Sequence, residues 1–223
     1  MSKFNIRKYQ PKDFIPIEDI VYRTGFKGED MTGLSFIDDK RLFFLISIFY
    51  YPKYEPEHCF VAVDAHTDKV VGFICGTPNT NQQETKYEKL IPWRIFLRTL
   101  GYTIWRYPKS FMNLLKLNKA RPDIGPSEFE EILAVYPAHL HINLLPEAQR
   151  QGLGSRLMAA FLDHLQFLDV PGVHLQTSSY NKKAIPFYSK LEFILVNKAN
   201  MDHFLFDDLK LLTFVKKIGP KPD

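Results

Sequence analysis

The sequence predicts a mixed α/β fold, with a central and mostly antiparallel sheet of about seven strands and helices on both of its faces. Short stretches rich in Val, Ile, Leu and Phe recur between turn residues, as strands do, and longer stretches have apolar residues at helical spacing. Two hairpin-like successions predict antiparallel pairs. One strand–helix–strand succession is long enough for a right-handed crossover, which predicts a single parallel pair.

The length of 223 residues is enough for one domain with a substantial core. The predicted strands and helices follow one another closely except over residues 79–136, a stretch too long for a simple connection. We therefore expect a single domain over 1–223 with a helical insertion at about 79–136. Hydrophobic residues make up 45% and charged residues 24%, which is ordinary for a globular protein.

Net charge and the positions of the cysteines indicate which partners, metal sites and cellular compartment to expect. A net charge of +4 is too small to predict nucleic acid as the main partner. Cys59 and Cys75 fall in or beside predicted interior strands without the spacing of metal ligands, so we expect reduced core cysteines and no metal. The first ten residues contain no apolar signal core, and no apolar run reaches about 18 residues. These features predict a cytoplasmic or nuclear protein without a transmembrane helix.

The first part of the chain predicts a strand, two helices and a hairpin. Residues 4–10 alternate as a strand does, and Asp13 is placed to cap a helix that runs through Tyr22. Ser35 or Asp38 begins a second helix that ends before Pro52. Residues 59–63 and 70–76 form the two strands of the hairpin around a polar turn.

The insertion has helical patterning in which basic residues alternate with aromatic ones. Its apolar residues on one side are Trp93, Phe96, Leu97, Leu100 and Ile104. Three interpretations compete, namely a lid over the active site or core, a homodimer surface, and a helix lying on a membrane. Pro92, Gly101 and Pro108 interrupt the pattern, so a membrane partner is not expected. Residues 120–131 read as a loop that ends in an acidic turn.

The last part of the chain predicts strands at 138–145 and 172–179 around a helix over 152–168. Asn181 caps a further helix, in which Pro186 predicts a kink or a late start. Residues 193–199 and 211–218 close the domain as an antiparallel pair.

Two glycines, Gly152 and Gly154, stand at the first of these strand-to-helix turns. Glycines there let the backbone approach a ligand and direct several N–H groups at one point, and the helix adds the positive end of its dipole. The pattern therefore fits an anionic group. An ordinary turn with a glycine needed for packing is the alternative.

Two segments carry a resemblance to a known family. Residues 144–154 (LLPEAQRQGLG) and 181–193 (NKKAIPFYSKLEF) resemble the two signature motifs of the GNAT superfamily of acetyl-CoA-dependent N-acetyltransferases. The resemblance covers nearly the whole chain outside the insertion. It implies the GNAT fold, in which the strand before the turn splays from its parallel neighbour, and transfer of acetyl from acetyl-CoA to a primary amine.

A closer resemblance concerns residues 136–154 (YPAHLHINLLPEAQRQGLG). They look like the acetyltransferase-like domains related to the C-terminal region of O-GlcNAcase, including their free-standing microbial relatives. Some such domains are thought not to catalyse. A catalytically weak or inactive module that binds CoA or a protein partner is therefore the alternative to an active N-acetyltransferase.

The resemblance places acetyl-CoA as co-substrate at the turn. Backbone N–H groups of the turn can surround the pyrophosphate, and the pantetheine arm is expected to pair with the main chain around 142–145. The expected cofactor-binding residues are Leu144, Leu145, Gln149, Arg150, Gln151, Gly152, Leu153, Gly154, Ser155 and Asn181. Arg150 and Glu192 stand where the family often has glycine, which costs on the order of 1 kcal/mol if either turn needs a positive φ.

Tyr188 matches the family tyrosine that protonates the CoA sulfur, and a core tyrosine is the alternative. His139, His141 and Asn143 lie on one face of the strand that leads to the thioester. We prefer His141 as general base, with His139 or a water as alternatives, since imidazole has a suitable pKa. Packing of both histidines under the insertion is the other interpretation. Asp202 and His203 are second-line candidates.

The acceptor is expected to be a small-molecule amine or an amine of a protein. The segments that would build its pocket carry no motif, so the sequence leaves its identity open. Tyr102 and Tyr107 could line that pocket or merely pack.

Overall fold

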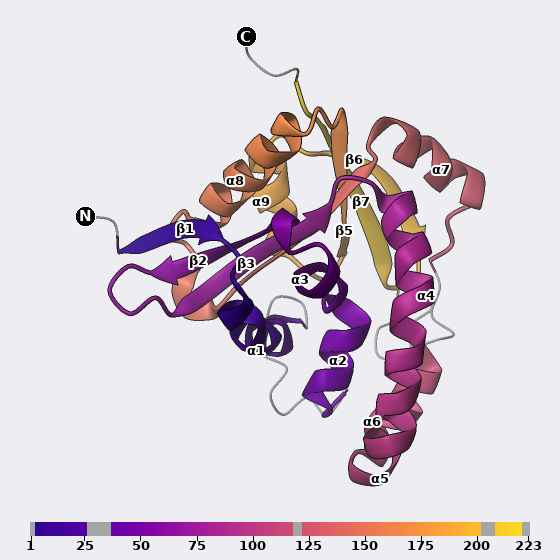
Figure 1. Cartoon of the computed structure of the whole chain (residues 1–223). Coiled ribbons are helices and arrows are strands. Elements are labelled where there is room, and N and C mark those ends of the chain that lie inside the picture. The colour runs from indigo at the N-terminus through magenta and orange to yellow at the C-terminus, as the bar shows by residue number, and fades with distance from the viewer. Residues whose placement is uncertain (1–2, 26–36, 118–121, 202–207, 220–223) are drawn as a thin grey trace.

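The computed structural model describes residues 3–25, 37–117, 122–201 and 208–219. Its strands are β1 (Phe4–Lys8), β2 (Cys59–Asp64), β3 (Val70–Thr77), β4 (Ala138–Leu144), β5 (Gly172–Ser178), β6 (Ile194–Asn200) and β7 (Lys210–Lys217). They form one sheet in the order β1-β2-β3-β4-β5-β7-β6 (Figure 1). Only β4 and β5 pair in parallel, and every other neighbouring pair is antiparallel.

The helices are α1 (Phe14–Thr24), α2 (Lys40–Ser47), α3 (Tyr50–Tyr54), α4 (Thr80–Arg98), α5 (Ile104–Arg106), α6 (Pro108–Leu117), α7 (Pro126–Val135), α8 (Leu153–Phe167) and α9 (Ala184–Lys190). A π-helical turn, Thr99–Thr103, joins α4 to α5. Helices α8 and α9 cover one face of the sheet, and α1 to α3 lie on the other (Figure 1). The predicted fold class is confirmed: a mixed GNAT fold with seven strands, one parallel pair and flanking helices.

The core is divided by the sheet into two apolar clusters. On the α8 side, Leu157 and Phe161 pack with Phe214 of β7, and on the other side Ile17 and Phe44 pack with Phe73 of β3. Strands β2 and β3 are buried on both faces, which explains their nearly unbroken apolar sequence. Cys59 and Cys75 are buried free thiols opposite each other in these strands, as predicted.

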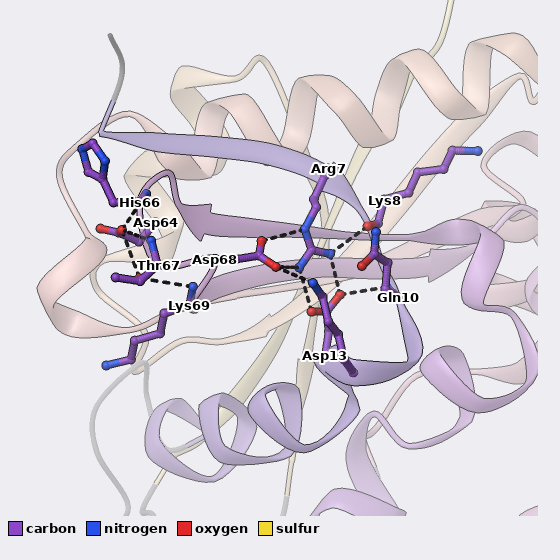
Figure 2. A network of polar contacts seen from close by, with 10 residues as sticks. Arg7, Lys8, Gln10, Asp13, Asp64, His66, Thr67, Asp68 and Lys69 are labelled. Atoms are coloured by element: carbon purple, nitrogen blue, oxygen red, sulfur yellow. Dashed lines mark hydrogen bonds and ion pairs between the residues drawn. The ribbon is translucent and has the colours of Figure 1, made fainter.

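Asp13 does not cap α1 through its side chain, contrary to the sequence-based expectation. Its buried carboxylate accepts hydrogen bonds from the Arg7 guanidinium at 2.7 and 2.9 Å and from the Gln10 N–H at 2.8 Å (Figure 2). Arg7 also reaches Asp68 in the β2–β3 turn, at 3.2 Å. Asp13 instead ties the start of α1 to Arg7 of β1, because a buried carboxylate needs a charged partner. Arg7 in turn links β1 to the hairpin through Asp68.

The start of α2 also differs from the prediction. The capping residue is Asp39, whose carboxylate accepts from the Leu42 N–H at 3.1 Å, and not Asp38. Ser35 lies outside the described residues. The helix ends before Pro52 as predicted, but Pro52 itself sits within the short helix α3.

Two expectations for the insertion were wrong. Residues 126–135 form helix α7 and not a loop, and its proline at the first position suits a helix start. Helix α4 continues through Pro92, because one lost backbone bond does not end a helix whose Ile91 is anchored in the core. Pro186 lies at the third position of α9, so this helix starts late, as predicted.

None of the helices in the described ranges combines the length and the apolar content that crossing a bilayer requires.

Candidate functional site

Strands β4 and β5 separate soon after they meet. They pair only at Ala138–Val173 and His139–His174, whereas β4 stays paired with β3 from His139 to Leu144. The Leu145 N–H bonds Val71 of β3, so by alternation the main-chain groups of Leu140, Ile142 and Leu144 point toward the gap. The predicted splay is present. It leaves backbone groups of the strand edges unpaired at the gap, and a ligand that carries amide groups can hydrogen-bond to them as an added strand would.

The turn after β4 has the geometry of an anion site. Arg150 and Gly152 both have positive φ, +58° and +73°, and a Cβ built on Gly152 meets no atom within 4 Å. The first three residues of α8 are Leu153 to Ser155. Their N–H groups have no acceptor within the helix, because no helical carbonyl lies one turn before them. Open space before three such amides fits a phosphate or pyrophosphate.

Gly154 also has the packing role that the sequence offered as the alternative. A Cβ at this position would lie 3.1 Å from the Phe187 ring and 3.3 Å from Leu144. Gly154 is buried, and it lets α8 pack against α9 and the end of β4. Packing therefore requires a glycine at 154, whereas Gly152 has open space where a side chain would lie.

Several predicted cofactor residues shape the turn through their own contacts. The Gln149 and Gln151 side chains donate to the carbonyls of Leu144 (3.1 Å) and Glu147 (2.8 Å). Asn181 caps α9, since its Oδ1 accepts from the Ala184 N–H at 3.2 Å.

The side chains of Leu145 and Leu153 are buried, and Ser155 is exposed at the helix start. Only the backbone of Leu153 is therefore open to a ligand. Arg156 donates to the Phe4 carbonyl at 3.0 Å.

A pocket of about 280 Å³ lies beside the gap. Strands β4 and β5 and both ends of the insertion line it, through Thr80, Glu84, Pro122, Ile124, Phe129, His139, Leu140, His141, His174, Leu175 and Gln176. The ends of the insertion thus wall this pocket, as a lid would. Tyr102 and Tyr107 do not line it; they pack against each other with ring centroids 5.9 Å apart.

His139 is held on both sides. Its Nε2 contacts the Tyr51 hydroxyl, and its Nδ1 lies 2.9 Å from the Thr80 hydroxyl. Burial, followed by the neighbouring His141 and His174, holds its pKa well below the usual value. His139 is therefore a neutral ring whose two nitrogens are already engaged, and it is a poor candidate for the general base.

His141 is placed more favourably. Its ring packs against those of Tyr51 and His139, with centroids 5.3 and 5.5 Å apart, and lines the pocket. Burial and His174 lower the pKa of His141 to about 4. The ring is neutral at physiological pH and able to accept a proton, although weakly. Asn143, the third residue on this face, donates to the Thr24 hydroxyl at 2.8 Å.

The sequence analysis missed Glu84 and His174, which line the pocket, and Tyr51, which contacts the pocket histidines. Tyr51 comes from α3, Glu84 from α4 and His174 from β5, so no local motif connects them. His174 Nδ1 lies 2.8 Å from the Tyr136 carbonyl. Burial and the nearby Glu88 raise the pKa of Glu84. The only signal in the sequence was that a carboxylate and a histidine each lie near a predicted strand end.

Tyr188 lies on the α8 side of the sheet, among Phe187, Phe193 and Phe214. Burial raises its pKa to about 12. His141 points to the opposite face of β4, so the two predicted catalytic side chains are separated by the strand and share only the gap. Asp202 and His203 lie outside the described residues.

The clustered histidines do not make a metal centre. Over the described ranges, no three His, Cys, Asp or Glu side chains are arranged to hold a metal ion.

Glu192 confirms the suspected strain. Its φ is +62°, where the family often has glycine. Its carboxylate pairs with Lys216 at 3.0 Å.

Comparison with known proteins agrees with this architecture. Residues 128–193 match the model of the acetyltransferase (GNAT) family. That segment contains β4, the turn, α8, β5 and all of α9, which are the elements around the gap. The closer resemblance to the O-GlcNAcase-related domains stays a prediction.

Solved structures resemble the chain over its full length. The protein SsHAT superposes with a TM-score of 0.74 at 28% identity, covering 98% of this chain and 100% of that one. YncA from Salmonella typhimurium, solved with its cofactor acetyl-CoA, gives 0.57 at 13% identity, covering 100% and 98%. A polyamine N-acetyltransferase from Drosophila melanogaster gives 0.55 at 16%, covering 96% and 99%. These similarities establish the GNAT fold.

Proposed function

We propose that this protein is an N-acetyltransferase that moves acetyl from acetyl-CoA to a primary amine by direct attack. The observation that carries the proposal is the gap between β4 and β5. It has an anion-binding turn at one end and a walled pocket beside it. A thioester held in the gap would meet an amine that enters from the pocket.

Acetyl-CoA fits the residues that are present. The amides of Leu153, Gly154 and Ser155 face the open space at Gly152 and would hold the pyrophosphate, with the exposed Arg150 adding positive charge. The main-chain groups of Leu140 and Ile142 point into the gap and would pair with the pantetheine amides. Leu144 would join them only after its carbonyl releases the Gln149 side chain.

The pocket favours a cationic amine with an apolar body. Glu84 is the only charged residue among the described residues that line it, and the histidines are neutral because their pKa values are lowered. Ile124 and Phe129 form an apolar wall. A carboxylate at the mouth attracts the ammonium group, and the apolar wall accommodates its carbon skeleton.

The bound ammonium ion first loses a proton, which His141 takes directly or through a water and passes to solvent. The free amine nitrogen then bonds the acetyl carbon, and its second proton leaves by the same route. The C–S bond then breaks, and Tyr188 donates its hydroxyl proton to the leaving thiolate. A pKa of about 12 keeps the Tyr188 phenol protonated until that step. We propose no covalent enzyme intermediate, since both cysteine thiols are buried in β2 and β3, with Cys75 opposite His141 of β4.

The first test is a thermal shift with acetyl-CoA, followed by thiol release with polyamines, aromatic amines, amino acids, aminosugars and histone peptides. Tyr188→Phe should lower turnover by at least about tenfold, because general acid catalysis typically contributes that much or more, and should leave acetyl-CoA affinity nearly intact. Unchanged turnover would remove Tyr188 from the mechanism, and the absence of any thermal shift would contradict acetyl-CoA binding.

A non-catalytic module that binds CoA is the second candidate. One specific observation favours it: His141 is a weak base, and both nitrogens of His139 are engaged. A clear thermal shift with acetyl-CoA but no thiol release with any amine would support this candidate.

A further inference from the structure

Residues 89–117 form a projection that we call the finger. It comprises the second half of α4, the π-helical turn, α5 and α6, and it extends away from the sheet at the lower end of α4 in Figure 1. Most of the large exposed apolar side chains of the described chain gather on it: Leu90, Trp93, Phe96, Leu97, Leu100, Tyr102, Trp105, Met112 and Leu115. Trp93 is 62% exposed and Trp105 is 80% exposed, so neither indole serves the core.

Helix α4 has two apolar sides: one is anchored to the domain and the other faces outward. At 100° per residue, Ile91, Ile95 and Arg98 share one side. Ile91 is fully buried, and Arg98 bonds the Asp39 carboxylate of α2 at 2.9 and 3.0 Å. These contacts fix the helix against the domain and so determine which of its sides faces outward.

The outward side of α4 carries Trp93, Phe96, Leu97 and Leu100, opposite the anchored side. The rings of Trp93 and Phe96 stack with centroids 5.4 Å apart. The stripe therefore faces away from the domain and is presented as one continuous apolar surface.

The charge of the finger has one sign. Residues 89–117 contain six basic residues and no acidic one, namely Lys89, Arg94, Arg98, Arg106, Lys109 and Lys116. The whole chain has 29 basic and 25 acidic residues, so the remainder has 23 and 25, a net charge of −2. The positive charge of this protein is thus concentrated on the finger, of which Arg98 is paired internally.

We propose that the finger docks on an anionic lipid surface. Exposed indoles and aliphatic side chains flanked by basic residues are the composition of helices that lie in a membrane interface. The apolar side chains stand on a convex helical projection, and a fluid lipid surface can take them up without a matching groove. A second copy would bring the basic residues of one finger against those of another, which electrostatic repulsion opposes.

The structure removes two of the three interruptions on which the expectation of no membrane partner rested, since only the third breaks the helix, at Tyr107 before Pro108. That expectation rested on Pro92, Gly101 and Pro108 as interruptions. The chain remains helical from Thr80 to Arg106, through both Pro92 and Gly101. Trp93 and Leu100 consequently stay on one surface. Glu84 lies nine residues before Trp93, roughly 14 Å along the helix axis, so docking leaves the pocket clear of the lipid.

The sequence supplies its own probe for the test. The chain has two tryptophans, Trp93 and Trp105, and both lie on the finger. The full chain is titrated with vesicles of phosphatidylcholine alone and of phosphatidylcholine with 30% phosphatidylserine, where this percentage is about the anionic content that attracts basic segments. We expect a blue shift of tryptophan emission and flotation with the anionic vesicles only, both weakened by 0.5 M salt, roughly the ionic strength at which such attraction is screened.

Two variants divide the apolar from the electrostatic contribution. Leu100→Ser with Trp105→Ser, and separately Arg106→Glu with Lys109→Glu, should each lower vesicle partitioning at least about tenfold. The matched control is Phe167→Ser, a 65% exposed aromatic residue on α8 outside the finger, which should leave partitioning unchanged. All of these side chains are exposed, so unchanged melting temperatures verify that each variant folds.

Other occupants give other results, each of which would overturn the proposal. Equal binding to neutral vesicles, or none to either kind, contradicts anionic lipid docking. A dimer mass in light scattering that the Leu100→Ser, Trp105→Ser variant abolishes assigns the finger to a second copy. Binding of polyglutamate without vesicle binding assigns it to an acidic protein. Thiol release without vesicles should be the same in these variants, so acetyl transfer is tested separately.

Discussion

The turn at residues 149–155 and the pocket walled by α4 and α7 share strand β4, but different kinds of contact build them. The turn is contiguous in sequence, and its ligand-facing groups are backbone amides fixed by local φ values. The pocket brings together side chains from α4, α7, β4 and β5, and its central rings depend on Tyr51 of α3. The cofactor half of the site is thus local and the acceptor half is tertiary, so substitutions should affect the two halves separately.

The largest effect is expected from Gly154→Val on the cofactor side. The new side chain would press on Phe187 and Leu144, and such overpacking costs about 1–3 kcal/mol. We expect a lower melting temperature and acetyl-CoA affinity reduced at least about tenfold, measured by calorimetry. Gly152→Ala is the matched control because it has open space, so only the positive φ opposes it, at about 1 kcal/mol. An equal effect of both variants would contradict the packing role of Gly154.

The second-largest effect should be a loss of folding stability at acidic pH, caused by the buried histidines. His139, His141 and His174 have lowered pKa values, chiefly from burial, and so do His58 and His164. Above pH of about 6.5 these rings are neutral in both the folded and the unfolded chain, so they impose no pH dependence. As the pH falls toward about 4, the unfolded chain binds more protons, and stability should decrease on the order of 1–3 kcal/mol.

Urea unfolding at pH 7.0, 5.5 and 4.5 measures this dependence. His141→Gln should weaken this dependence of stability on pH, because the glutamine does not titrate. A slope that is the same in the variant would mean that His141 is not buried in its neutral form.

Glu84→Gln should weaken the acceptor half alone. Removing the carboxylate from a partly exposed position costs about 1 kcal/mol of attraction for an ammonium group, so KM for a cationic amine should rise about fivefold. Acetyl-CoA affinity should not change, because the turn is built from other elements. Glu88→Gln, on the same helix but not lining the pocket, is the control. A loss of acetyl-CoA binding in Glu84→Gln would show that the two halves are coupled.

The smallest effect is expected at Glu192, outside both halves. Its φ of +62° is unfavourable for any residue with a Cβ, so Glu192→Gly should stabilise the fold by up to about 1 kcal/mol, less the loss of its exposed pair with Lys216. Thermal melting measures the change, and acetyl-CoA affinity should be unaltered. A destabilised variant would mean that the Lys216 pair outweighs the backbone strain.

The sequence-based predictions were accurate for local features and less accurate for features that depend on tertiary contacts. Strands β2 to β7 and helix α8 carry strong apolar periodicity and were found close to their true limits. Errors occurred where one polar residue has several possible partners. Asp13 could cap α1 or pair with Arg7, and the choice depended on Arg7 lying beside it in the folded chain. Helix α7 was missed because its acidic residues looked like a polar turn.

Sequence alone determined the strands, the one parallel pair and the turn that follows β4, because each depends on periodicity or on glycine at a fixed place in the chain. The splay of the parallel pair was expected from the resemblance to the GNAT superfamily. Tertiary structure decided the rest. It separated Gly152 from Gly154, engaged both nitrogens of His139, and lowered the pKa of His141 to about 4. It also turned the apolar side of the insertion outward by anchoring Arg98 to Asp39. Burial and partners depend on segments distant in sequence, and no local pattern records them.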